Sequence, residues 1–209
     1  MQYDPNRHHR HSIRLSDWDY TLGAYFVTIC VQNREMVFGN VVNGEMQLNA
    51  SGIIVAEYWH NLPRHFPTVE LGPFVVMPNH VHFIISLNPP AVGAQFVGAQ
   101  FVGAQFNCAP TNQTPTNTPV APARTVTQNG SPIGKPFTVD KQHPTLGQVV
   151  RAFKAATARL IRQAGNNDFA WQRNYYEHII RNEAECQRIA QYIHANPAKW
   201  ITDWENPNR

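Results

Sequence analysis

Two histidines one residue apart, His80 and His82, are the residues whose type and spacing point most directly to chemistry. They stand in the apolar run 75–85 (VVMPNHVHFII), which is typical of a β-strand. Successive side chains of a strand alternate between its faces, so both imidazoles lie on one face and Val81 and Phe83 on the other. This is a geometry for two metal ligands, although two structural histidines with internal hydrogen bonds would share the pattern.

A tyrosine further along the chain is the candidate nucleophile. Residues 186–197 (CQRIAQYIHANP) predict a helix that Asn182 caps and that ends after Asn196, because a proline follows. Tyr192 and Asn196 lie one turn apart on one face of this helix. Such a tyrosine is most often half-buried packing, but beside a divalent ion on a phosphodiester its phenolate could attack phosphorus. A reference pKa of about 10 means that the phenol needs such help.

A basic helix and an aromatic segment precede this tyrosine. Residues 146–162 predict an amphipathic helix whose polar side carries four basic residues and no acid, namely Arg151, Lys154, Arg159 and Arg162. An all-basic face favours a phosphate backbone, with an ordinary wet surface as the alternative. The segment 171–181 (WQRNYYEHIIR), which includes Arg173, is predicted as a strand. Its interleaved aromatic and basic residues suit single-stranded nucleic acid, although aromatic side chains on an edge strand often only pack.

Stretches rich in β-branched and aromatic residues predict the elements that must position these groups. Strands are expected over residues 25–31, 36–42, 46–48, 69–77 and 80–87, with the second and third joined at Asn43-Gly44 as a hairpin. A helix capped by Asn49 or Ser51 is expected to run through about Asn61, before Pro63 stops it.

Length and composition limit the other possibilities. The chain has 209 residues, enough for one well-buried domain plus an excursion, and a formal net charge of +3, which is compatible with a polyanionic partner without demanding one. Its three cysteines are widely separated, so reduced thiols and a cytoplasmic location are expected. A signal peptide and an apolar stretch of about 18 residues are both lacking, so no membrane partner is predicted.

Two regions look separate from the core. Between residues 88 and 144 a Gly-Ala-Gln-Phe-Val repeat is followed by a Pro, Thr, Asn and Gln-rich tract. Because this tract lacks the apolar density of a core, it is predicted as a disordered insertion, with a functional binding tract as the alternative. The basic amino-terminal arm, with Arg10 and Arg14, could reach a groove or backbone of DNA or could be a loose solvated terminus.

Taken together, these motifs resemble the REP-associated tyrosine transposases of the single-tyrosine HUH transposase family. The resemblance rests on residues 23–29 (GAYFVTI), 77–82 (MPNHVH), 146–162, 171–178 (WQRNYYEH) and 192–197 (YIHANP). It implies an α+β, ferredoxin-like antiparallel sheet with helices packed on it. The implied HUH domain covers 23–88 and 144–200, interrupted by the insertion at 89–143 and flanked by the arm at 1–22 and a tail at 201–209.

The resemblance also implies a mechanism and its residues. His80, His82 and Asn196 would bind Mg²⁺ or Mn²⁺, although relatives carry glutamine at the position of Asn196. Tyr192 would attack a DNA phosphate, leaving a 5′-phosphotyrosine and a free 3′-hydroxyl that can rejoin without ATP. The implied substrate is single-stranded DNA folded into hairpins, such as REP palindromes. The DNA-binding candidates are Arg151, Lys154, Arg159, Arg162, Arg173, Arg10 and Arg14.

Two other classes of function stay open at this point. One is a domesticated or inactive sequence-specific DNA-binding protein. The other is a metal-dependent phosphodiesterase that uses activated water, in which Tyr192 would merely pack. The sequence also leaves open whether the chain works as a monomer or a homodimer, and whether Tyr192 serves the metal site of its own chain or that of a partner.

Overall fold

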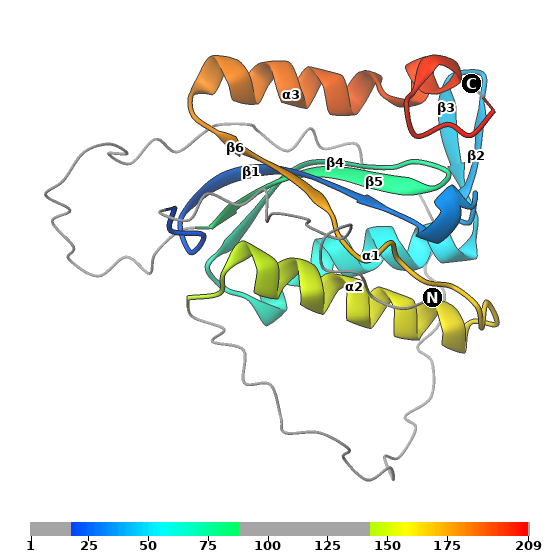
Figure 1. Ribbon diagram of the computed structural model, residues 1–209, viewed down its shortest axis with the longest axis horizontal. Helices are drawn as coiled ribbons and strands as arrows, with labels where there is room; N and C mark the ends of the chain where they lie inside the picture. Colours follow the sequence, from blue (N-terminus) through cyan, green and yellow to red (C-terminus); the bar gives the residue numbers. More distant parts are fainter. Residues whose placement is uncertain (1–17, 88–142, 209) are drawn as a thin grey trace, which may run out of the picture.

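The computed structural model describes residues 18–87 and 143–208 (Figure 1). The insertion predicted to be disordered, and Arg10 and Arg14 of the arm, lie outside these residues. The main elements in chain order are β1 (Gly23–Cys30), α1 (Ala50–His65), β4 (Val69–Val76), β5 (His80–Leu87), α2 (Leu146–Gln163), β6 (Tyr176–Ile180) and α3 (Glu183–Ala195). Short elements lie between β1 and α1, namely η1 (Gln32–Arg34), β2 (Gly39–Val42) and β3 (Glu45–Leu48), and η2 (Pro197–Thr202) follows α3.

Four strands form one antiparallel sheet in the order β4-β5-β1-β6. A strand, a helix, two strands, a helix and a strand follow one another along the chain, and the first and third strands of this series are the central pair. This is the ferredoxin-like topology, so the predicted α+β fold class is confirmed. The remaining strands, β2 and β3, form a separate two-stranded ribbon.

Helices cover both faces of the sheet. Helices α1 and α2 lie on one face and α3 on the other, as Figure 1 shows edge-on. The main core lies between the sheet and the first two helices, where Val81 and Phe83 of β5 pack with Trp59 of α1 and Phe153 of α2. A smaller cluster under α3 includes Ile84 of β5. Because side chains alternate along a strand, β5 supplies both layers from adjacent residues.

The helix boundaries follow from capping groups. Asn49 accepts a hydrogen bond from the Gly52 amide at the start of α1, and Asn182 accepts one from the Glu185 amide at the start of α3. The prediction that Pro63 stops the first helix is wrong, because α1 continues to His65. A proline so close to a helix end removes one backbone donor from the last turns, and the Phe66 amide still bonds to the Leu62 carbonyl.

The predicted hairpin turn is present between β2 and β3. Asn43 and Gly44 both have positive φ, of 54° and 80°, as a tight hairpin turn requires, but the first strand of the ribbon begins at Gly39 and not at residue 36. Cys30 is a free thiol, as the sequence predicted. Among the described helices, none has the length and apolar character needed to cross a bilayer.

Candidate functional site

The two histidines of β5 lie side by side on the face that α3 covers. His80 and His82 are 0% and 3% exposed, and their Nε2 atoms are 3.0 Å apart. They pair across the sheet with Cys30 and Thr28 of β1. The strand therefore points both imidazoles to one face, as the sequence predicted.

Two neighbours hold the outer nitrogens of these rings. Asn79 Oδ1 lies 2.8 Å from His80 Nδ1, and Thr28 Oγ1 lies 2.8 Å from His82 Nδ1. Asn79 donates through Nδ2 to two carbonyls, so its Oδ1 is the acceptor and His80 Nδ1 carries the proton. The Nε2 atom of His80 then presents a lone pair, which is the arrangement of a metal-binding histidine with a supporting hydrogen bond.

Tyr192 reaches the same point from α3. Its hydroxyl lies 3.3 Å from His82 Nε2, and the residue is 43% exposed. Phe26 of β1 packs edge-on against the Tyr192 ring, with ring centroids 6.0 Å apart. It also packs against the His82 ring, with ring centroids 5.4 Å apart. The helix and the strand thus bring a phenolic oxygen to the histidine pair, while leaving Tyr192 partly exposed.

Asn196 lies one turn beyond Tyr192, as predicted, at the end of α3. It is 1% exposed, and its Oδ1 has no hydrogen-bond partner within the described part of the chain. A buried amide oxygen without a partner costs free energy, on the order of 1–3 kcal/mol. An oxygen held in this way beside Tyr192 is available to a cation, which fits the ligand role that the resemblance implied.

Asp203 is the residue that sequence reasoning missed. One ligand atom from each of His80, His82 and Asp203 lies within 4.8 Å of the others, and this group could hold a metal ion. Asp203 follows η2, in the stretch assigned by prediction to a tail. The only signal in the sequence was an acidic residue seven positions after Asn196, and nothing local indicates that the chain turns back there.

Arg34 and Asn79 hold this carboxyl-terminal segment against the sheet. Arg34 forms an ion pair with Glu205 at 3.0 Å and donates to the Trp204 carbonyl at 3.0 Å. Asn79 donates to the Glu205 carbonyl at 2.7 Å. Since Asn79 also orients His80, one buried amide links the segment that carries Asp203 to the first histidine.

Burial keeps both imidazoles neutral. Desolvation, assisted by the Arg34 charge, lowers the pKa of His80 to about 3. Desolvation, followed by the charge on His80, places the pKa of His82 well below its usual value, against an opposing effect of Asp203. Burial also raises the pKa of Tyr192, and the carboxylate of Asp203 adds to this effect. At neutral pH the histidines are therefore in the ligand form, and Tyr192 is protonated unless a cation is bound beside it.

The donor set fits a divalent cation. Two ligand atoms about 2.1 Å from an ion and at right angles to each other lie about 3.0 Å apart, which matches the separation of the two Nε2 atoms. Asp203 supplies a negative charge, and Asn196 supplies an oxygen without a partner. Carboxylate and amide oxygens are donors for Mg²⁺ and Mn²⁺, while imidazole also suits Zn²⁺.

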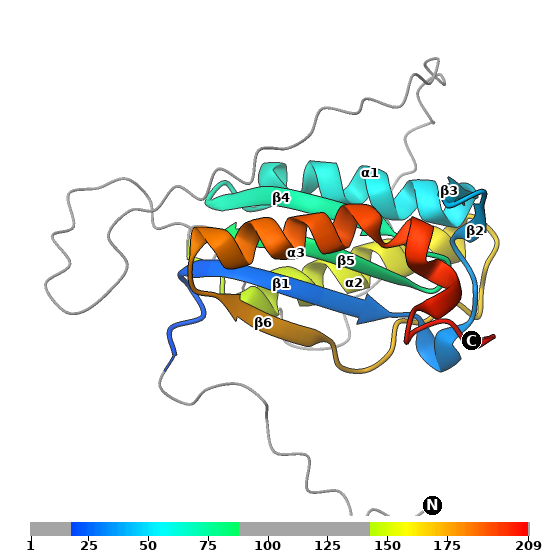
Figure 2. The ribbon, with the colours of Figure 1, turned by 90° about the horizontal axis from the view of Figure 1, so that it is seen from above.

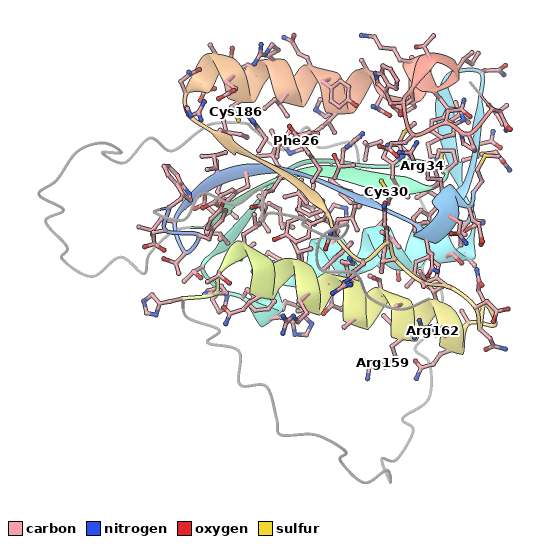
Figure 3. All side chains as sticks on the ribbon, in the orientation of Figure 1. Phe26, Cys30, Arg34, Arg159, Arg162 and Cys186 are labelled. Atoms are coloured by element: carbon pink, nitrogen blue, oxygen red, sulfur yellow. The ribbon has the colours of Figure 1, made fainter. Side chains whose placement is uncertain are left out.

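The predicted basic helix is on the other side of the sheet. Arg159 and Arg162 project from α2, away from the face that carries α3 (Figure 3). Lys154 donates to the backbone carbonyls of residues 172–174, and Arg162 Nε donates to the Phe169 carbonyl at 2.9 Å. These two side chains therefore hold the connection between α2 and β6. Of the predicted set on this helix, Arg151, Arg159 and Arg162 are exposed, whereas Lys154 is partly buried.

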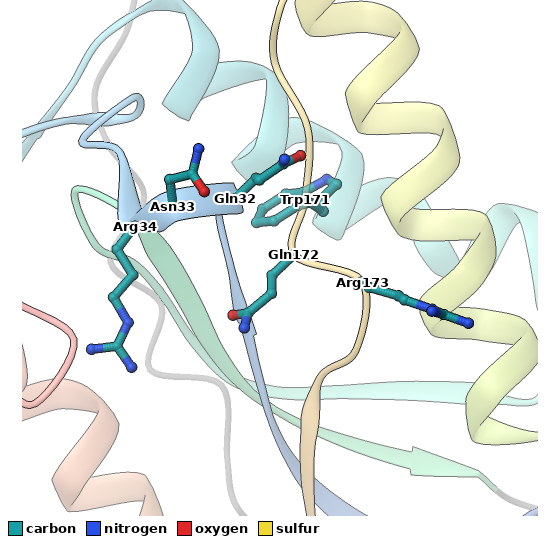
Figure 4. Close-up of a pocket in the computed structure, with 6 residues that line it drawn as sticks. All are labelled: Gln32, Asn33, Arg34, Trp171, Gln172 and Arg173. Atoms are coloured by element: carbon teal, nitrogen blue, oxygen red, sulfur yellow. The ribbon is translucent and has the colours of Figure 1, made fainter. Parts of the chain in front are cut away.

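Arg173 lines a cavity of about 550 Å³ between η1 and the segment that leads into β6. Its other lining residues are Gln32, Asn33, Arg34, Trp171 and Gln172. Figure 4 shows that the Arg173 side chain extends toward α2, whereas Arg34 extends toward the carboxyl-terminal segment. The two guanidinium groups diverge, so the cavity does not form a single anion site.

Fold and site together define a ferredoxin-like α+β protein with a His-His-Asp group beside a tyrosine. No family model matches the chain. An uncharacterized protein of Haemophilus influenzae strain Rd is 36% identical over 203 residues, which is 97% of this chain and 96% of that protein. The chain belongs to the same family as this Haemophilus protein.

Two solved structures are similar to the chain at low sequence identity. One is a REP-associated tyrosine transposase bound to a REP hairpin, with a TM-score of 0.48 and 17% identity, covering 89% of this chain and 74% of that one. The other is a candidate transposase from Deinococcus radiodurans R1, with a TM-score of 0.42 and 14% identity, covering 88% of this chain and 96% of that one.

Proposed function

We propose that this chain is a transposase of the REP-associated, single-tyrosine HUH kind, which cleaves and rejoins hairpin-bearing single-stranded DNA. The observation that carries the proposal is the meeting of three side chains. The Tyr192 hydroxyl lies 3.3 Å from His82 Nε2, which itself lies 3.0 Å from His80 Nε2. A nucleophile from a helix and two lone-pair donors from a strand thus converge beside solvent, which packing alone does not require.

Four side chains would hold the metal ion, Mg²⁺ or Mn²⁺. They are His80, His82 and Asp203, together with the buried Oδ1 of Asn196. When bound, the ion supplies positive charge that favours the phenolate and neutralises the scissile phosphate. Thr28 and Asn79 keep the two imidazoles in their orientation through the outer nitrogens.

The bond changes take place at one phosphorus atom. The phenolic oxygen of Tyr192 gives its proton to water, which reaches the half-exposed ring, and then forms the new phosphorus–oxygen bond. The bond from phosphorus to the 3′ oxygen breaks, and this oxygen takes up a proton as the free 3′-hydroxyl. The 5′ side stays on Tyr192 as a phosphotyrosine. Rejoining reverses these changes with a 3′-hydroxyl as the nucleophile, so no ATP is consumed.

The DNA would lie mainly on the α3 face of the sheet. Arg151 and Arg159 are exposed across the sheet from Tyr192, so we assign them to a distant part of a hairpin or to a second strand. Lys154 would act by holding the chain before β6, because backbone carbonyls already occupy its ammonium group, and Arg162 would do so through its Nε, which donates to the Phe169 carbonyl.

A covalent adduct tests the proposal. The substrate is a labelled single-stranded hairpin taken from inverted repeats that flank the gene, incubated with the full chain and Mn²⁺. The protein should acquire a DNA label that survives denaturation, and Tyr192→Phe should abolish it while binding is retained. Tyr176→Phe is the matched control, because it removes a hydroxyl from another exposed tyrosine on the same face of the sheet.

The other outcomes separate the remaining classes of function. Cleavage without any adduct would favour a phosphodiesterase that uses activated water. Hairpin binding without cleavage would favour a DNA-binding protein that has lost its catalytic activity. An adduct that persists in Tyr192→Phe would overturn the assignment of the nucleophile.

A further inference from the structure

Part of the sheet face that carries the candidate site lies beside α3 and not under it. The helix packs mainly on β4 and β5, and β6 runs along the outside of β1 (Figure 2). Phe26 and Thr28 of β1 pair with His178 and Tyr176 of β6, so these four side chains share the face that carries His82. This edge of the sheet is a surface next to Tyr192.

Strand alternation separates the aromatic residues of the segment that leads into β6. Trp171 is buried in the main core and donates through Nε1 to Thr157 Oγ1 at 2.9 Å. Tyr175 packs against the same core. Tyr176 points to the opposite face and is 53% exposed. Of the aromatic residues that predicted nucleic-acid binding here, Tyr176 is the one that offers its ring to solvent.

Phe26 connects this ring to the candidate site. Its ring centre is 6.2 Å from that of Tyr176, in an edge-to-face contact at 68°, and 6.0 Å from that of Tyr192. It also touches His82, with centroids 5.4 Å apart. The Tyr176 ring is therefore held within one intervening side chain of the candidate nucleophile, and its exposure leaves ring surface free for a ligand.

We propose that Tyr176 is a stacking platform for an unpaired DNA base close to the phosphate that Tyr192 attacks. The inference rests on the proposed function and names how that site positions its substrate. An aromatic ring beside a phosphate-binding site suits an unpaired base, because every base has a π face and stacking tolerates any sequence. His178, the next residue of β6 on the same face, is ionisable, so Tyr176 does not belong to a purely apolar patch of the sort that docks a protein.

Two oligonucleotides of equal length and charge isolate the stacking. The probes are a twelve-nucleotide oligothymidylate and a twelve-residue abasic strand, each titrated against the full chain with EDTA present to prevent cleavage. Tyr176→Leu should weaken oligothymidylate binding by about 5-fold or more and leave abasic binding unchanged. Tyr176→Phe keeps the ring and should bind both probes as the unmodified chain does.

Each other result overturns the inference. Equal losses on both probes would mean that Tyr176 acts on the backbone or on the fold, and unchanged oligothymidylate binding in Tyr176→Leu would mean that no base stacks there. Photocrosslinking of a 5-iodouracil-substituted oligothymidylate should also label Tyr176, and labelling confined to other residues would reject it.

These readouts can fail independently of the proposed function. Loss of base-dependent binding in Tyr176→Leu, with no adduct in the unmodified chain, would keep the platform and reject the nucleophile. A normal Tyr192 adduct, together with unchanged base-dependent binding in Tyr176→Leu, would support Tyr192 as the nucleophile and reject Tyr176 as the platform.

Discussion

The two faces of the sheet use the same strands for opposite purposes. Toward α1 and α2, β5 presents Val81 and Phe83 to a continuous apolar core that includes Trp59. Toward α3, it presents His80 and His82, whose nitrogens are satisfied by side chains and not by packing. The first face derives stability from burial, whereas the second keeps polar groups buried beside a half-exposed tyrosine. Stability and chemistry are thus assigned to alternate residues, and substitutions should separate them.

The largest expected effect is on the core face. Phe83→Ala should lower the free energy of unfolding by about 3–5 kcal/mol, because it removes a buried ring that packs on Trp59 and Phe153. His82→Ala should cost clearly less, because water can enter beside Tyr192 and satisfy Thr28. Urea unfolding at pH 7 measures both, and equal losses would contradict the division between the two faces.

A bound metal ion should stabilise the chain only through the face of the sheet that carries His80 and His82. A divalent ion that binds the folded state stabilises it by about 2.7 kcal/mol at a concentration 100 times its dissociation constant. Mn²⁺ should therefore raise the thermal midpoint of the unmodified chain and of Phe83→Leu, but not that of His80→Ala. A rise of the same size in His80→Ala would place the ion elsewhere.

Removing the hydrogen bond that orients His82 should weaken metal binding less than removing a histidine. Thr28→Val keeps the shape of the side chain but removes the oxygen 2.8 Å from His82 Nδ1. Mn²⁺ affinity, measured by titration calorimetry, should fall about 10- to 100-fold. Val27→Ala is the control on the opposite face, and it should leave the affinity unchanged while reducing stability.

The smallest effect concerns α3, away from the site. Glu185 accepts hydrogen bonds from the Arg181 amide at 2.9 Å and from His178 Nε2 at 2.8 Å. These bonds, the backbone bond foremost, lower the pKa of Glu185, so its contribution to stability is present above the pKa of the unfolded chain and is lost as pH falls through the folded value. Glu185→Gln should cost about 1 kcal/mol at pH 7. The difference should shrink as pH falls below the pKa of a glutamate in the unfolded chain, and a difference that does not change with pH would indicate a packing effect.

The parts predicted well are those that local rules determine. Alternation along a strand put His80 and His82 on one face, helical spacing put Tyr192 and Asn196 together, and capping by Asn182 set the start of α3. The ferredoxin-like topology came from resemblance to a family, and the sheet order confirms it.

The parts missed depend on contacts between distant residues. Asp203 lies beside the histidines on a segment that Arg34 and Asn79, which are far away in sequence, hold against the sheet. Asn79 was part of a recognised motif, but its bonds to Glu205 and His80 could not be read from the motif. The helical wheel of α2 placed its basic residues on one side, but it could not tell which face of the sheet the helix covers.

The alternation of β5 also protects against misfolding. If its pairing with β1 slipped by one residue, His80 and His82 would turn into the apolar core, and Val81 and Phe83 would turn out toward Tyr192. Such a chain would bury two imidazoles without Thr28 and Asn79 as partners, and it would lose its main aromatic contacts as well. The two histidines therefore favour the correct pairing of β5 with β1, because a chain with these strands misaligned would lose both its core packing and the site beside Tyr192.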